Sequence, residues 1–455
     1  MMKKIKTYLS LENTQCLLLG LLEITLMTHA YSPYPTIEYV LRRDGYFADV
    51  SDEKKDKIFS NIYSLVLLFN QCNKIFLGIL LDKKGFWVVR GIVHVQQFIG
   101  YLLMIIMTPA TDYLAYVGVP LVLGSTIGYI FTSIKIIGVL GKENKGIWNS
   151  ANGAAVSLGL QLYLIYRQLN PSKIFWGILM AFMPISIIRT FFYTPRSNQF
   201  KNGIGWQTRY DKVENNKSDN IFRDAIKILG GTPHMWLLFF WFVISDLRSQ
   251  SYVVMYQNWL EWAADRDEDK IGYYTDVNIF MGLLSIPMSI LNGILIDKMT
   301  GFLTAKFEGG SKKLTRKNCE VISCFCFQAL GLISGAIYSA FLCFPVGWTT
   351  YIAILFKNYA NLNLFPIRNI FIYCVTDPKL FGSVMGLCNL YALVSAFTSP
   401  FFIDILNSLF AGNYVAFELT FAGICLFGVL APVLNYLWIF RWDKKRYVLE
   451  MTQKN

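Results

Sequence analysis

The sequence predicts an all-α membrane protein with twelve transmembrane helices in two six-helix halves, and three observations support this prediction. The 455-residue chain is 54% hydrophobic and only 16% charged, and its mean hydropathy is positive. Apolar runs of about 20 residues, long enough to cross the hydrocarbon core of a bilayer, recur along the whole chain. A six-residue phrase at the end of the second run returns at the end of the eighth, which indicates two similar halves.

The apolar runs define the expected spans and halves. The runs lie at about 14–33, 58–81, 88–109, 115–140, 147–166, 172–193, 234–256, 275–296, 319–341, 346–374, 381–404 and 414–440. The longest polar stretch separates six runs from six. We therefore expect an N-terminal half at 1–193, a cytoplasmic central loop at 194–233, a C-terminal half at 234–440 and a cytoplasmic tail at 441–455.

The net charge of +12 is explained by membrane orientation and does not indicate nucleic-acid binding. Lys and Arg gather at the chain start, in the central loop, at 298–317 and in the tail. These segments share one side of the membrane if both termini are cytoplasmic, as the positive-inside rule requires. We expect a multi-pass protein of the plasma membrane whose partners are the lipid bilayer and a small-molecule substrate.

The repeated phrase reads Gly-Ile-Leu-Leu-Asp-Lys at 78–83 and Gly-Ile-Leu-Ile-Asp-Lys at 293–298. Each copy ends an apolar run at the cytoplasmic side and is followed by a glycine. Gly78 is expected to allow close helix approach, and Gly85 a tight turn. A duplication that keeps helix end, charge and turn together is typical of secondary transporters.

The aspartate of each copy predicts a gating contact. We expect Asp82 and Asp297 to lie against the positive N-terminal end of a helix from the opposite half. For Asp82 the expected partner is the start of the run at 381–404. Arg90, at the start of the third run, is expected to bind the same carboxylate. The second copy has no arginine at the matching distance, so the first copy carries the stronger prediction.

Charged residues inside apolar runs are costly and need a reason. Glu23 lies within the first run, and Asp246 and Arg248 lie halfway along the seventh. The tenth run carries Asn361 and Asn363 as well as the cations Lys357 and Arg368. Three further cations are expected to reach the inner surface with flexible side chains and to be structural: Lys74, Lys135 and Arg189.

These residues predict a substrate site if the first, fourth, seventh and tenth helices line a central cavity. A guanidinium suits a carboxylate and a carboxylate suits an ammonium, so the set is suited to a zwitterion. We expect Arg248 to bind the substrate carboxylate and Glu23 the ammonium, with Asp246, Asn361 and Asn363 near them. An interhelical ion pair of Arg248 is the chief alternative, and the two amides are equally suited to joining helices.

An acidic cluster after the seventh run bears on substrate charge. It consists of Glu261, Asp265, Asp267, Glu268 and Asp269. Such a cluster concentrates cationic solutes when it lines an entrance, or it is simply a solvated turn.

Two runs carry a resemblance to a known family. Residues 240–248, Tyr252 and 258–260 resemble the seventh helix of solute carrier family 43. Residues 381–387, 393–396 and 400–402 are similar to that family's eleventh helix, and 78–90 resemble the wider major-facilitator loop. The resemblance implies the major facilitator fold and facilitated transport of large neutral amino acids, in a family that includes a nucleobase carrier. The similar apicomplexan transporters carry cationic and aromatic amino acids.

Other classes are disfavoured. The sequence has no Gly-rich phosphate loop, no His-Glu-x-x-His metal site and no Gly-x-Ser-x-Gly elbow, so we expect neither an enzyme nor a cofactor. Nine cysteines, nearly all in apolar runs, predict neither a disulfide framework nor a metal site. Transport of a nucleobase or another small organic solute, proton coupling through Glu23 or Asp246, and a non-transporting membrane sensor remain alternatives. The oligomeric state is not predicted.

Overall fold

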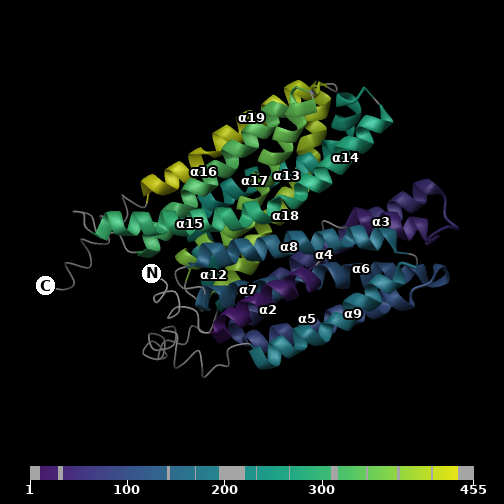
Figure 1. The fold of residues 1–455 in the computed structure, drawn as a ribbon, viewed down its shortest axis with the longest axis horizontal. Coiled ribbons are helices and arrows are strands. Elements are labelled where there is room, and N and C mark those ends of the chain that lie inside the picture. The colour runs from purple at the N-terminus through teal and green to yellow at the C-terminus, as the bar shows by residue number, and fades with distance from the viewer. Residues whose placement is uncertain are drawn as a thin grey trace. The chain divides into compact units, whose positions relative to one another are not determined.

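The computed structural model describes residues 11–28, 34–140, 144–169, 171–193, 221–231, 233–265, 267–308, 316–344, 347–376, 380–410 and 413–438. Within these ranges the protein is almost entirely helical and has no β-strand (Figure 1). The predicted tail at 441–455 and most of the predicted central loop lie outside them. The central loop does contain one described helix, α12 (Ile221–Gly231).

Each predicted span coincides with a helix or a helix pair. In the N-terminal part these are α2 (Leu11–Met27), α4 (Asp52–Lys83), α5 (Phe86–Ile106), α6 (Ala115–Ser125) with α7 (Ile127–Leu140), α8 (Lys145–Gln168) and α9 (Lys173–Ile188). In the C-terminal part they are α13 (Pro233–Ala263), α14 (Glu268–Leu283) with α15 (Ser285–Glu308), α16 (Arg316–Leu342), α17 (Gly347–Val375), α18 (Phe381–Phe410) and α19 (Tyr414–Gly428).

Many of these helices are long and apolar enough to cross a membrane. By length and composition, seven of the described helical segments can cross a membrane, or eight if the bent pair of Ile221–Gly231 and Pro233–Tyr252 counts as one. The described helices expose large apolar side chains such as Phe280, Phe401 and Leu409, each about 70% exposed. Exposed apolar surface on this scale is expected where lipid replaces water.

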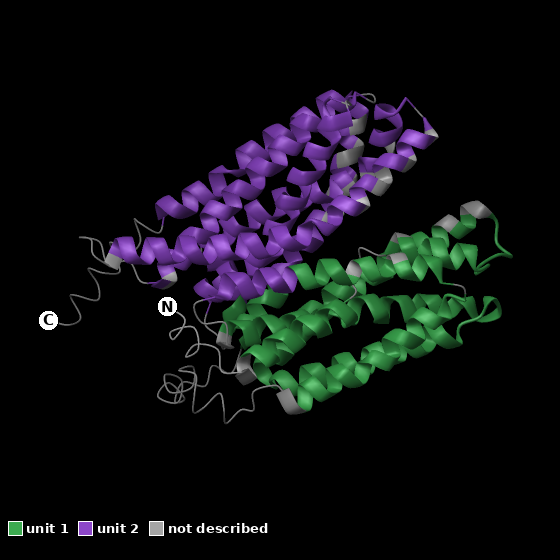
Figure 2. Cartoon of the chain, viewed as in Figure 1, with its two compact units in different colours: residues 1–143, 154–225, 379–387 green, residues 144–153, 226–378, 388–455 purple. Residues whose placement is uncertain are grey.

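The chain forms two compact units (Figure 2). Unit 1 comprises residues 1–143, 154–225 and 379–387, and unit 2 comprises 144–153, 226–378 and 388–455. The first residues of α8 therefore belong to unit 2, and the first residues of α18 belong to unit 1. In unit 1, α4 and α5 pack against α6, and α5 also packs against α9; in unit 2, α16 packs against α15, α17 and α19.

The segment between the first two predicted spans, 34–57, contains a helix that the sequence did not predict. Residues Tyr34–Arg43 form α3, and α4 already begins at Asp52. Along α3 the apolar side chains of Tyr34, Ile37 and Leu41 recur at helical spacing and are buried. Glu38 and Arg42, one turn apart, form an ion pair of 2.6 Å on its other side. The charges of Glu38 and Arg42 lower the mean hydropathy of this segment, so hydropathy alone does not identify the helix.

The acidic cluster has a structural role at one position. Asp267 is the N-cap of α14, and its carboxylate accepts hydrogen bonds from the amides of Asp269, at 3.1 Å, and Lys270, at 3.3 Å. The hydrogen bond from the Lys270 side chain, together with these amides, holds the pKa of Asp267 below its usual value. The cap explains why the helix begins before the apolar run predicted at 275.

Candidate functional site

Asp82 makes the predicted contact with the start of a later helix. One carboxylate oxygen accepts from the amide of Gly382 at 3.0 Å, and the other from the amide of Ser383 at 2.6 Å. Both amides lie in the first turn of α18, where backbone N–H groups have no partner within the helix. Lys135 lies 3.5 Å from the same carboxylate, which is fully buried. The segment 379–387 and Asp82 all belong to unit 1.

Asp297 makes the same contact in unit 2. Its two carboxylate oxygens accept from the amides of Gly146, at 2.8 Å, and Ile147, at 2.9 Å. These amides open α8, which is the fifth span as α18 is the eleventh. The second copy of the phrase therefore forms its contact as fully as the first, although it lacks a nearby arginine. Each unit thus joins a carboxylate to two successive amides in the first turn of a helix.

The glycines beside both aspartates permit this approach. A Cβ added to Gly78 would lie 2.2 Å from the carbonyl oxygen of Gly382, and one added to Gly293 would lie 2.6 Å from that of Gly146. Only glycine fits at such distances, so the duplicated glycine serves backbone contact between helices. Gly85 adopts a φ of 85°, a left-handed conformation, and forms the predicted turn before α5.

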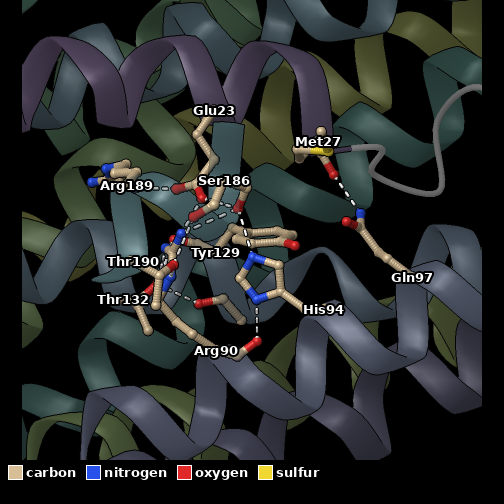
Figure 3. Close-up of polar contacts among 11 residues, drawn as sticks. Glu23, Met27, Arg90, His94, Gln97, Tyr129, Thr132, Ser186, Arg189 and Thr190 are labelled. Atoms are coloured by element: carbon tan, nitrogen blue, oxygen red, sulfur yellow. Dashed lines mark hydrogen bonds and ion pairs between the residues drawn. The ribbon is translucent and has the colours of Figure 1, made fainter. Parts of the chain in front are cut away.

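Arg90 does not bind Asp82, so this sequence prediction is wrong. The Arg90 side chain is fully buried in unit 1 and forms an ion pair with Glu23 (Figure 3). Its Nε donates to Thr190 at 2.6 Å and its Nη1 to Thr132 at 3.3 Å. The physical reason is that backbone amides already occupy both oxygens of Asp82, whereas the buried carboxylate of Glu23 requires a cation to compensate its charge.

Glu23 is held by two arginines. Arg90 and Ser186 donate to one carboxylate oxygen, and Arg189 donates to the other. Arg189 lies at the start of the π-helical turn η3 (Arg189–Tyr193), which ends the sixth span. The cluster therefore ties the first, third and sixth spans of unit 1 together. Glu23 is 1% exposed and paired with two arginines, so it has an internal role in this structure. Its binding of a substrate ammonium stays a prediction.

A histidine extends this cluster. His94 lies one turn after Arg90 on α5, with Nδ1 2.5 Å from the Arg90 carbonyl oxygen and Nε2 2.9 Å from the Ser186 hydroxyl. The ring meets that of Tyr129 edge-on, at 5.5 Å between centroids. On the far side of the ring from the arginines, Gln97 donates to the last carbonyl of α2, that of Met27, at 2.7 Å (Figure 3).

Unit 2 buries a second ion pair, whose acidic partner was not predicted from the sequence. Arg248 is 2% exposed and lies 2.5 Å from Glu418 on α19. Its Nε donates to Ser339 of α16 at 2.7 Å, and its guanidinium carbon lies 4.2 Å from the centre of the Tyr338 ring. The partner could have been found from sequence, because Glu418 is an acid near the start of the twelfth run. The interhelical ion pair that we kept as the alternative for Arg248 is therefore present.

The two clusters tie equivalent helices with opposite charges. In unit 1 the first helix supplies the acid and the sixth supplies a base, whereas in unit 2 the first helix, α13, supplies the base and the sixth, α19, the acid. The third helix contributes in both cases, through Arg90 and Ser339. Breaking such a buried pair by removing one partner costs about 3–5 kcal/mol, because the other charge stays behind.

Arg248 and Asn361 share a small pocket inside unit 2. The pocket is also lined by Ser245, Tyr338 and Leu364, and its volume is about 10 Å³. This is room for about one water molecule, so the pocket does not hold an amino acid in this conformation. A substrate role for Arg248 and Asn361 stays a prediction.

Asn363 and Asp246 have partners within unit 2. Asn292 donates to the side-chain oxygen of Asn363 at 2.7 Å, and Asn363 itself is fully buried. It therefore joins helices α17 and α15, as buried amides often do. Asp246 is buried and accepts a hydrogen bond from the hydroxyl of Ser395 on α18.

Two of the three cations expected at the inner surface are instead buried. Arg189 belongs to the Glu23 cluster, and Lys74 is 6% exposed and donates to Gln71 at 3.3 Å. Only Lys135 keeps a partly exposed side chain. The described side chains contain no group of three or more His, Cys, Asp or Glu residues that could hold a metal ion.

This arrangement of helices is the major facilitator fold, that of multi-pass membrane proteins. The chain is similar to the proton:xylose symporter XylE, with a TM-score of 0.62, 14% identity and 96% of both chains covered. It is also similar to the human organic anion transporter MFSD10, with a TM-score of 0.59, 16% identity and coverage of 92% of this chain and 99% of that one. The fucose:proton symporter FucP of E. coli gives a TM-score of 0.58 at 11% identity, with 92% and 98% covered.

These similarities establish the fold alone, because sequence identity is low throughout. No protein-family model and no curated protein sequence matches the chain.

Proposed function

We propose that this protein is a secondary transporter that moves small organic solutes, and amino acids in particular, across a membrane by alternating access. The observation that carries the proposal is the pair of aspartate contacts at Asp82 and Asp297 within the major facilitator fold. A transporter that alternates between two states needs contacts that form in one state and break in the other. Hydrogen bonds between a carboxylate and free helix amides can break without unfolding either helix, because water replaces the lost partner.

Transport is favoured over enzyme activity by the fold, since the similar structures named above are transporters. Their substrates, by name a sugar or an organic anion, differ widely, so the fold does not select a substrate. The proposal of amino acids rests on the resemblance to solute carrier family 43 and on the charged and amide residues within the spans. Large neutral or aromatic amino acids and cationic ones are both candidates. A nucleobase or another small organic solute is the alternative.

The gating set of the proposal is Gly78, Asp82, Gly85 and Asp297. The substrate set is that predicted from the sequence: Glu23, Asp246, Arg248, Asn361 and Asn363. We place the protein in the plasma membrane with both termini in the cytoplasm. We also propose that the halves 1–193 and 234–440, joined by the loop 194–233, move against one another. Epitope tags at both termini should bind antibody only after the cells are permeabilised, and binding to intact cells would reject this orientation.

Uptake tests the proposal directly. The chain is expressed in oocytes, and uptake of labelled arginine, lysine, leucine, tyrosine and adenine is compared with that of water-injected cells. Uptake of any amino acid supports the proposal, adenine alone selects the nucleobase alternative, and no uptake together with ligand binding selects a sensor. Uptake of the transported solute is then measured in sealed vesicles with and without a pH gradient, which tests proton coupling. Uptake by a facilitative carrier does not change with the gradient.

A further inference from the structure

One cation inside unit 2 has no carboxylate partner among the described side chains. Lys357 lies on α17, ten residues after the helix begins at Gly347. At 1.5 Å per residue this is about 15 Å along the helix, near the middle of a hydrocarbon core about 30 Å thick. A charge at this depth is costly unless it is paired or functional.

The surroundings of Lys357 use only part of its hydrogen-bonding capacity. Its Nζ lies 3.3 Å from the side-chain oxygen of Asn278 on α14, which is its hydrogen-bond partner. The same oxygen accepts from the hydroxyl of Tyr252 at 3.4 Å. The ammonium also lies 4.7 Å from the centre of the Tyr252 ring. A lysine ammonium has three donors, so two remain for a ligand, and the side chain is partly exposed.

Three buried arginines of the described chain differ in this respect because each binds a carboxylate. Arg90 and Arg189 bind Glu23, and Arg248 binds Glu418. In particular, Arg248, which the sequence suggested for a substrate carboxylate, already binds the carboxylate of Glu418. Among the described side chains, the partners of Lys357 are a neutral amide and an aromatic ring, which stabilise a cation without neutralising it.

Aromatic side chains pack together beside Lys357. Tyr252 packs against Tyr256 with ring centroids 4.8 Å apart, and both belong to a cluster that also contains Trp259 and Tyr338. Asn361 lies one turn further along α17, on the same face as Lys357. A cation beside aromatic rings matches a solute that has a carboxylate and an apolar or aromatic body. It does not match a solute whose side chain is itself a cation.

We propose that Lys357 binds the carboxylate of the transported solute, with Asn278 and Tyr252 holding its ammonium in place, and that the substrates are carboxylates with an apolar or aromatic body. This inference rests on the proposed function and narrows its substrate class. It assigns to Lys357 the role that the sequence suggested for Arg248.

Three probes of similar shape test the chemistry. Tyrosine has an amine and a carboxylate, 3-(4-hydroxyphenyl)propionate has only the carboxylate, and tyramine has only the amine. We expect the first two to raise the midpoint of thermal unfolding of the purified full-length protein, and tyramine to leave it unchanged. Stabilisation by the propionate identifies an organic acid as sufficient, whereas stabilisation by tyrosine alone means that the amine is also recognised. Stabilisation by tyramine and not by the propionate would overturn the inference.

Two variants test the residue. Lys357→Gln removes the cation and is expected to weaken binding and low-concentration uptake by about 10- to 150-fold, the range that one hydrogen bond to a charged group supports. Asn278→Asp keeps Lys357 and provides it with an internal carboxylate, and it should weaken carboxylate binding without loss of folded protein. If Lys357→Gln fails to reach the membrane, Asn278→Asp alone tests whether Lys357 binds the solute carboxylate. Lys270→Gln is the matched control, because it removes the same charge from a 62% exposed side chain on the same helix as Asn278.

The outcomes separate this inference from the proposed function. If the wild type takes up tyrosine and both variants respond to it as the wild type does, Lys357 has no binding role and the transporter remains. If the wild type takes up only adenine and no carboxylate stabilises it, the inference fails and transport stands. If carboxylates stabilise the wild type and not the variants, yet nothing is taken up, the binding site stands and transport fails.

Discussion

The contact of Asp82 with the start of α18 leads to a prediction that can be measured at individual peptides. Asp82→Asn replaces a carboxylate that accepts from two amides by a side chain with one acceptor oxygen and one donor group. The oxygen can still face one of the two amides, but the new donor then faces the N–H of the other. The substitution therefore removes one hydrogen bond and weakens the second, without changing the size of the side chain.

The magnitude follows from the kind of bond that is lost. A hydrogen bond to a charged group contributes about 1.5–3 kcal/mol, and each 1.36 kcal/mol corresponds to a factor of ten. The amides of Gly382 and Ser383 have no partner within their own helix, so their protection from solvent depends on Asp82. We expect these amides to exchange with deuterium about 10- to 150-fold faster in the variant.

Hydrogen exchange read by mass spectrometry in lipid nanodiscs is the assay, and the duplication provides the control. In Asp82→Asn, a peptide covering 380–387 should exchange faster while a peptide covering 145–150 is unchanged. Asp297→Asn should give the reverse, because Asp297 holds the amides of Gly146 and Ile147. Uptake by both variants should change, since each contact belongs to the proposed gate.

Unchanged exchange at 380–387 in Asp82→Asn would refute the contact itself. Faster exchange with normal uptake would leave the contact in place and refute its role in gating.

Three further predictions concern buried charge and backbone contact. Glu418→Gln leaves Arg248 buried without an anion and should cost about 3–5 kcal/mol, seen as a lower thermal unfolding midpoint in detergent. Combining Glu418→Leu with Arg248→Met should restore most of that loss, and a double variant as unstable as the single one contradicts the assignment. Glu23→Gln removes the anion from two arginines and should lower the heat resistance of the detergent-solubilised protein at least as much; an unchanged midpoint would count against the cluster. Gly382→Ala places a Cβ 2.5 Å from a carbonyl oxygen of α4 and should reduce uptake at equal surface level, whereas Gly423→Ala, whose Cβ meets nothing within 4 Å, should not.

The sequence was sufficient to predict the spans and the contact of Asp82. Apolar runs of bilayer length need no tertiary information, because a helix in lipid must satisfy its own backbone. The repeated phrase added a charge at a fixed place relative to a helix end, and a carboxylate at that place has few partners besides a helix start. The helix α3 was not predicted, because Glu38 and Arg42 lowered the hydropathy of a segment whose buried side recurs at helical spacing.

The partners of the buried charges could not be predicted from the sequence. Asp82 is the acid nearest to Arg90 along the chain, but the side chain of Arg90 points to Glu23, which is 67 residues away. Arg248 meets Glu418 across 170 residues. Which acid a cation meets depends on how six helices rotate about their axes, and a rotation of one residue, about 100°, changes every such pairing. For the same reason the sequence singled out Arg248 and gave no reason to prefer Lys357.

The distance along the chain between Arg248 and Glu418 has a consequence for how the protein is made. At about 5–20 residues per second, the ribosome needs about 10 to 30 s to add the 170 residues between them. During that time α13 already carries a cation that costs about 2.5–3.5 kcal/mol at the centre of a lone transmembrane helix. Nascent α13 must therefore be retained by the insertion machinery or by neighbouring helices until α19 arrives. A chain that stops before residue 414 never supplies the acid, so it exposes an unpaired arginine that membrane quality control can recognise.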